Sequence, residues 1–168
     1  MTSVLFRALF LIFTFFAIPS CSSDNSKLPT SNAALSQKIV DYTYNTSEIE
    51  TMNLINNYRV SIGLNSLATI NYISLKSEEH DNYMIINNVV DHNDFILRSE
   101  NIMNVLGAKS VSENIAYNYN SSQSVLNAWL ASPEHKKNIE GNFTHFGIAI
   151  RVDPATGKKY YTNIFAKI

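Results

Sequence analysis

Four histidines are the side chains of this chain that are best suited to chemistry: His80, His92, His135 and His145. A neutral imidazole nitrogen binds divalent metals, and imidazole also exchanges protons near neutral pH. No two of the four have the i, i+4 spacing that places two ligands on one face of a helix. Any site that they share must therefore be assembled by the fold.

The lone cysteine, Cys21, indicates a different chemistry. Arg7 precedes an apolar run over residues 8–18, which is shorter than the roughly 20 residues of a membrane-spanning helix and typical of a signal-peptide core. A proline and then a small residue stand directly before Cys21. This arrangement resembles the lipobox of bacterial lipoproteins, which implies that residues 1–20 are a signal peptide and that Cys21 is acylated. The alternative is an ordinary secreted protein with an incidental cysteine.

The overall charge limits the partners of such an exported chain. The sequence has 13 Lys and Arg against 14 Asp and Glu, and removal of the signal peptide takes away Arg7. Without a basic excess to bind phosphates, nucleic acid is not expected as a partner. With its one cysteine acylated, the chain has neither an internal disulfide nor a cysteine nucleophile. The expected partner is the bacterial membrane, bound through the lipid at Cys21, with the protein in the periplasm or at the cell surface.

A polar segment separates Cys21 from the rest of the chain. Residues 21–46 are interpreted as a lipid-anchored linker, although residues 35–46 suit a short strand equally well. As a flexible coil this linker would span about 25–30 Å on average, which keeps whatever follows close to the membrane. Residues 47–168 are enough for one domain with a substantial core, but not for two.

Apolar periodicity predicts that this domain begins with helices. Ser47 and Glu50 have the spacing of a capping box, and the apolar stripe behind them predicts a helix over about 48–61. Further helices are expected over about 70–88, from Phe95 to a stop at Gly107, from Ser122 or Ser124 through Leu130, and from Ser132-Pro133 to Gly141.

The period changes to two near the C-terminus. Apolar residues alternate with others from Phe146 to Val152, which predicts a half-buried strand. Residues 153–157 suit a turn and Tyr160–Phe165 a returning strand, so a C-terminal hairpin is expected. Residues 111–119 are a candidate third strand. Helices first and strands late predict an α+β fold, with helices on both faces of a small sheet.

Several short motifs occur in the order and at the intervals of one known family. They are Asn56-Asn57-Tyr58-Arg59 with Gly63-Leu64, His80 and His92, Arg98 and Gly107, Ser112-Glu113-Asn114-Ile115-Ala116, and Trp129 with Ser132-Pro133-Glu134-His135-Lys136-Lys137-Asn138-Ile139, Phe143-Thr144 and Phe146-Gly147-Ile148. Together they resemble the bacterial branch of the CAP superfamily, also called the SCP domain, over residues 47–168. The resemblance implies a three-layer α-β-α sandwich with a small, mainly antiparallel sheet.

The resemblance also implies a central cleft lined by two histidines and an acidic partner. By position, His92 is the first cleft histidine, Glu113 the acid and candidate catalytic residue, and His135 the second histidine. Asn114 and His80 lie near enough in the family to line the cleft. In some members such a cleft holds zinc or another divalent cation, and His92, His135 and Glu113 would be the ligands here.

The chain departs from the family pattern at three positions. Ser112 and Glu134 replace glycines that usually precede the glutamate and the second histidine, and His145 stands where relatives often have an acid. A site with two histidines and one glutamate carries less charge than the full set of the animal and plant branches. The resemblance alone therefore leaves metal binding open.

Other residues of the motifs have structural explanations. Arg59 and Asn114 are suited to satisfying backbone groups at helix ends and in loops. Trp129 lies on an apolar stripe that is typical of a core, and Ser132 has no adjacent base and starts a helix.

Three functions fit these observations. A binding module would hold an envelope or extracellular ligand (a lipid, glycan or peptide) in the cleft, and it is favoured because no complete catalytic triad is present. A metal-assisted hydrolase of peptides or cell-wall material would use His92 and His135 as ligands and Glu113 as ligand or general base. A non-enzymatic surface platform would present its loops to a partner.

Overall fold

The domain is built on one four-stranded sheet. The computed structural model describes residues 40–168, so the predicted signal peptide, Cys21 and most of the linker lie outside the described residues. The strand order is β1-β3-β4-β2, in which only β1 is parallel to its neighbour. The strands are β1 (Ala68–Thr69), β2 (Ser110–Tyr117), β3 (His145–Val152) and β4 (Lys159–Lys167). The predicted C-terminal hairpin and the third strand are confirmed.

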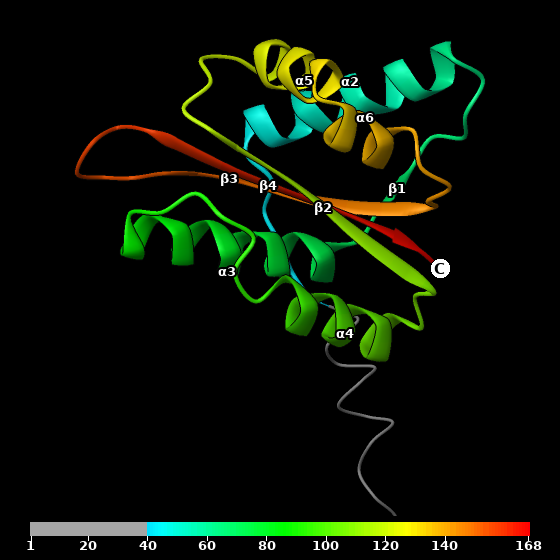
Figure 1. The fold of residues 1–168 in the computed structure, drawn as a ribbon, viewed down its shortest axis with the longest axis horizontal. Coiled ribbons are helices and arrows are strands. Elements are labelled where there is room, and N and C mark those ends of the chain that lie inside the picture. Colours follow the sequence, from blue (N-terminus) through cyan, green and yellow to red (C-terminus); the bar gives the residue numbers. More distant parts are fainter. Residues whose placement is uncertain (1–39) are drawn as a thin grey trace, which may run out of the picture.

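Helices cover both faces of this sheet (Figure 1). One layer contains α2 (Thr46–Ser61), α5 (Ser122–Ala131) and α6 (Pro133–Ile139), and the other contains α3 (Asn71–Asn87) and α4 (Phe95–Leu106). This arrangement confirms the three-layer α-β-α sandwich. Within residues 40–168, no helix has the length and apolar character needed to cross a membrane.

The two central strands are buried on both faces, not on one as the alternation predicted. Residues 146–150 of β3 and 160–166 of β4 are all buried. Phe146 and Ile148 pack into the core shared with α2 and α5, while Gly147 lies against the backbone of α3. The alternation was therefore one of large and small apolar residues between two helical layers, and the expectation of a solvent-exposed face was wrong.

Gly147 permits the close approach of α3 to β3, and its replacement provides a test of this packing. A Cβ atom at this position would lie 2.4 Å from the backbone nitrogen of Ser74 and 2.7 Å from the carbonyl carbon of Ile73. Because backbone atoms of a packed helix cannot move aside separately, we expect Gly147→Ala to lower the free energy of unfolding by about 3 kcal/mol in a urea titration. Gly157→Ala, which meets no neighbour but has a φ of +71°, should cost about 1–2 kcal/mol. Equal losses in the two variants would contradict this account.

The start of α2 differs from the prediction by two residues. Asn45 is the N-cap and forms the capping box with Glu48, whereas Ser47 and Glu50 were expected in these roles. Glu50 instead accepts a hydrogen bond from the Ser122 hydroxyl at 2.9 Å, which joins α2 to α5. The chain before the helix, residues 40–45, already contacts the domain, because the Tyr44 hydroxyl bonds to Ser74 of α3 at 2.9 Å.

Arg59 and Trp129 have the structural roles that their positions indicated. The buried guanidinium of Arg59 donates to the carbonyl oxygens of Asn65 at 2.9 Å and Gly141 at 3.0 Å, so it joins the end of α2 to two loops. Trp129 is buried in the core, and its indole nitrogen donates to the carbonyl oxygen of Ile115 at 2.9 Å. That bond gives a partner to a backbone carbonyl group of β2, which is an edge strand of the sheet.

Candidate functional site

Glu113 is the centre of the polar network beside β2. Its side chain is buried, and the guanidinium of Arg98 from α4 binds both carboxylate oxygens. Nε of Arg98 donates to Oε2 at 2.8 Å and Nη2 donates to Oε1 at 2.9 Å. This forked geometry is the strongest form of a guanidinium–carboxylate pair, and it compensates the charge of the buried acid.

His92 is the second partner of Glu113. It lies on the loop between α3 and α4, and its Nδ1 is 2.8 Å from Oε1 of Glu113. Because a carboxylate oxygen accepts, Nδ1 carries the proton of this bond, and Nε2 is the ring nitrogen that does not contact Glu113. The side chain of His92 is 48% exposed. Glu113 therefore fixes the orientation of an imidazole that remains accessible to a ligand.

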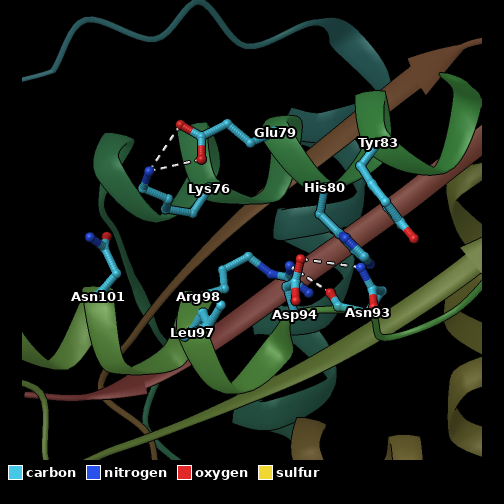
Figure 2. Close-up of a pocket in the computed structure, with 9 residues that line it drawn as sticks. All are labelled: Lys76, Glu79, His80, Tyr83, Asn93, Asp94, Leu97, Arg98 and Asn101. Carbon is cyan, nitrogen blue, oxygen red and sulfur yellow. Dashed lines mark hydrogen bonds and ion pairs between the residues drawn. The ribbon is translucent and has the colours of Figure 1, made fainter.

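His80 lies on the other side of the ion pair. Its Nε2 donates to the carbonyl oxygen of Asp91 at 2.8 Å, which attaches the loop that carries His92 to α3. Burial is the main cause that lowers the pKa of His80, and the nearby Glu113 acts in the opposite direction. Figure 2 shows the polar pocket of about 340 Å³ between α3 and α4 that His80 and Arg98 line. His80 was expected to line the cleft, but it lines this neighbouring pocket and holds the loop.

The candidate cleft crosses the exposed edge of β2. It is a cavity of about 410 Å³ between the His92 loop and α6, lined by His92, Phe95, Val111, Ser112, Glu113, Glu134, His135 and Asn138. The fold thus brings His92, Glu113 and His135 together, as the family resemblance implied. Glu134 also lines the cavity, which the sequence did not indicate.

Two asparagines position the helix that carries His135. The side-chain amide of Asn114 donates to the carbonyl oxygen of His135 at 3.0 Å. Asn138 in turn donates to the Asn114 side chain at 2.8 Å and to the carbonyl oxygen of Glu113 at 3.2 Å. Asn114 therefore does not line the cleft but holds the backbone of α6, which carries His135, against β2. Burial and then the neighbouring His92 lower the pKa of His135, whereas Glu134 raises it.

An apolar groove continues from the cleft along the start of α4. It has a volume of about 680 Å³ and is lined by residues 92–97. His92 and Phe95 line both hollows, so the groove and the cleft adjoin. Ile96 and Leu97, in the groove, are 71% and 63% exposed.

The side chains of the cleft do not fit a three-ligand zinc site. Within residues 40–168, no three His, Cys, Asp or Glu side chains come together in a way that could hold a metal ion. Glu113 gives both oxygens to Arg98, and one of these oxygens also binds His92. Of the three predicted ligands, only the two imidazoles would remain as free donors, whereas zinc sites use three or four protein ligands.

The cleft also lacks an activated nucleophile. Ser112 provides the one hydroxyl group of its lining, and the Oγ atom of Ser112 is buried without a hydrogen-bond partner. A serine nucleophile needs a base within about 2.6–3.2 Å. Ser112 therefore does not have the geometry of an activated serine nucleophile, whereas the rest of the lining offers hydrogen-bonding groups and apolar side chains.

Comparison with known proteins identifies the family. The model of the cysteine-rich secretory protein family, CAP, matches residues 52–165, which is more than half of the chain. The chain belongs to the CAP family. The resemblance inferred from the motifs is thereby confirmed. No curated protein matches the sequence.

Solved structures support the CAP fold. The chain is similar to an outer surface protein of Borrelia burgdorferi, with 18% identity and a TM-score of 0.63 over 76% of this chain and 98% of that protein. It is also similar to an SCP-domain extracellular protein of Bacillus anthracis, with 22% identity and a TM-score of 0.63 over 76% of this chain and 45% of that protein. Venom allergen-like protein 4 of Schistosoma mansoni gives 12% identity and a TM-score of 0.59 over 74% of this chain and 90% of that protein.

Arg98 and Phe95 are two further residues of this CAP domain whose roles the sequence did not indicate. Arg98 stands in the motif order, but its spacing from Glu113 along the chain says nothing of a bond between α4 and β2. Phe95 was predicted as the start of a helix, which it is, but its place in the lining of both the polar cleft and the apolar groove was not predicted. His145, a further candidate, starts β3, and its Nδ1 is 2.9 Å from the Thr144 hydroxyl oxygen.

Proposed function

We propose that this CAP domain is an exported binding protein that holds an amphiphilic envelope ligand in the cleft beside Glu113. The observation that carries the proposal is that His92 and Phe95 line both the polar cleft and the apolar groove. A ligand with a polar head and an apolar tail would fill both hollows at once. Of the three ligand classes that the sequence left open, this geometry favours a lipid over a glycan or a peptide.

The head group that suits the cleft is neutral. The lowered pKa of His135 favours an uncharged ring at neutral pH, and the carboxylate of Glu134 lines the same cavity. A hydroxyl or amide head can donate a hydrogen bond to an imidazole nitrogen, whereas an anionic head would meet Glu134 without a compensating cation. The proposal therefore distinguishes neutral lipids from fatty acids.

Titration with two probes of equal chain length tests this function. We expect 1-decanoylglycerol to bind the purified protein at pH 7.5, and decanoate to bind at least about tenfold more weakly, because of Glu134. His135→Ala should weaken decanoylglycerol binding by roughly tenfold, the effect of one lost hydrogen bond. Lys137→Ala, an exposed neighbour on α6 that does not line the cleft, is the matched control. Isothermal titration calorimetry measures all four affinities.

The pH dependence gives the same test an independent readout. An imidazole that accepts a hydrogen bond must be neutral, so affinity for decanoylglycerol should fall as His135 becomes protonated. Because burial lowers the pKa of His135, the fall should occur below the ordinary value of about 6.5. A folded protein that binds neither probe would contradict the proposal, and unchanged affinity in His135→Ala would place the ligand elsewhere.

A further inference from the structure

Three consecutive apolar residues, Phe95, Ile96 and Leu97, begin α4 and form what we call the α4 ridge. Ile96 and Leu97 are among the most exposed large apolar residues of residues 40–168, whereas Ile102 and Leu106 on the same helix are buried. Single exposed apolar side chains are ordinary on protein surfaces. Neighbouring exposed apolar side chains beside an apolar groove form a continuous apolar surface, and such surfaces often bind another protein or a membrane.

The described chain begins on the same layer of the sandwich as the ridge. Val40 packs against the core cluster of α3 and α4, and its carbonyl oxygen accepts a hydrogen bond from Asn71 of α3 at 2.8 Å. Figure 1 shows this start of the chain beside α4, on the opposite side of the sheet from α2, α5 and α6. The chain that leads to Cys21 therefore joins the domain on the side that carries the ridge.

The length of this connection keeps the domain at the membrane. Residues 22–39 lie between Cys21 and Val40, and even a fully extended chain of that length spans at most about 65 Å. A domain confined in this way meets the bilayer at a high effective concentration, so that a small apolar surface is enough to dock it. The apolar phase nearest to the ridge is then the bilayer itself.

The charges around the ridge are not those of a surface that binds anionic head groups. Asp94 and Glu100 flank it, and the guanidinium of Arg98 is already paired with Glu113. Attraction to anionic lipids requires clustered Lys or Arg side chains at the contact. Docking by the ridge would therefore rest on insertion of apolar side chains into the interface, as in amphipathic surface helices.

We propose that the α4 ridge docks into the bilayer to which Cys21 is attached, so that the cleft beside His92 opens at the membrane surface. This inference rests on the lipid anchor predicted at Cys21 and extends the proposed function. It identifies the source of the amphiphilic ligand as the bilayer beneath the domain. The groove along Phe95 would then be the path by which an acyl chain passes between the bilayer and the cleft.

Depth-dependent quenching on the full-length acylated protein tests the docked orientation. An environment-sensitive dye is attached at Glu100→Cys, which is exposed near the ridge, or at Ala155→Cys, in the β3–β4 turn away from α4. The protein is reconstituted into phosphatidylcholine vesicles with nitroxide-labelled lipids. We expect the dye at position 100 to be quenched at least about twofold more than the dye at position 155. High salt should leave the difference unchanged, because no charge attraction is involved.

Paired variants separate the ridge from other exposed apolar residues. Ile96→Ser with Leu97→Ser should reduce quenching at position 100 to the level at position 155. Val60→Ser with Ile62→Ser, which are 59% and 46% exposed and lie on or next to α2 in the opposite layer, should leave it unchanged. Equal quenching at the two dye positions in the protein with an intact ridge would overturn the inference.

Two further outcomes would also overturn the docking proposal while leaving ligand binding intact. Failure of the full-length chain to incorporate into vesicles through its lipid would remove the anchor on which docking depends. A dimer in detergent that the paired Ile96 and Leu97 substitutions dissociate would assign the ridge to contact between two copies. In either case, binding of decanoylglycerol in solution by the protein with an intact ridge still tests the cleft separately.

Discussion

Replacing Glu113 with glutamine should lower the free energy of unfolding by about 3–5 kcal/mol and remove ligand binding from the cleft. The Glu113 carboxylate accepts two hydrogen bonds from Arg98 and one from His92. An amide retains only one acceptor oxygen and places an NH₂ group against donors. Arg98, whose side chain is 9% exposed, would then be a nearly buried cation without its anion.

Urea unfolding and calorimetric titration measure the two effects of Glu113→Gln. Glu134→Gln is the matched control, because Glu134 is an exposed acid of the same cleft and its loss should change stability by no more than about 0.5 kcal/mol. Wild-type stability together with full affinity in Glu113→Gln would contradict the central role of the carboxylate. It would also favour the alternative in which the domain is only a platform for its loops.

A second substitution separates stability from binding. Adding Arg98→Met to Glu113→Gln removes the unpaired cation, and replacement of a buried ion pair by groups without charge is often nearly neutral. We therefore expect the double variant to recover most of the lost stability. His92 would keep only a neutral amide oxygen as acceptor, which holds its ring less firmly than a carboxylate does, so the affinity for decanoylglycerol should remain below that of the wild type. Recovery of both properties would show that Glu113 acts on the fold alone.

The sequence predicted the positions of the cleft residues better than their partners. Family spacing predicted that His92, Glu113 and His135 lie near one another, and all three line one cavity of the fold. The sequence could not predict that Arg98 neutralises the charge of Glu113, because an ion pair between a helix and an edge strand produces no regular spacing along the chain. The metal alternative depended on that missing information, since a carboxylate held by a guanidinium is a poor ligand.

Local sequence patterns were also ambiguous at places where tertiary contacts determine the structure. Two overlapping capping boxes were available at the start of α2, Asn45 with Glu48 and Ser47 with Glu50. The first is formed because Glu48 also has partners outside the helix, on the preceding segment and on β3. In the same way, alternation along β3 showed a strand, but its burial on both faces follows from α3 and could not be predicted from the strand itself.

Glu48→Gln, a change outside the cleft, should lower the free energy of unfolding by about 3 kcal/mol. The fully buried carboxylate accepts hydrogen bonds from the Tyr42 hydroxyl at 3.0 Å and from the backbone nitrogen of Ile150 at 2.9 Å, and Arg151 lies 2.6 Å from it. It also completes the capping box of α2 through the backbone nitrogen of Asn45 at 2.8 Å. An amide cannot accept from all of these donors.

The matched control for Glu48→Gln is Glu78→Gln, which removes the other carboxylate bound to Arg151. Glu78 is partly exposed, so its loss should cost less than about 1 kcal/mol, as for other surface ion pairs. Hydrogen exchange provides a second measurement, because Glu48 is one of the residues that hold Tyr42 and the segment before α2 onto β3. We expect faster exchange over residues 40–48 in Glu48→Gln but not in Glu78→Gln. This segment connects the domain to the chain that leads to Cys21, so under the proposed lipid anchor its release would also free the domain to rotate on the membrane. In Glu48→Gln we therefore expect less quenching of the dye at position 100, while the affinity of the cleft for decanoylglycerol is retained. This result would link the hydrogen bonds of one buried carboxylate to the orientation of the domain on the bilayer.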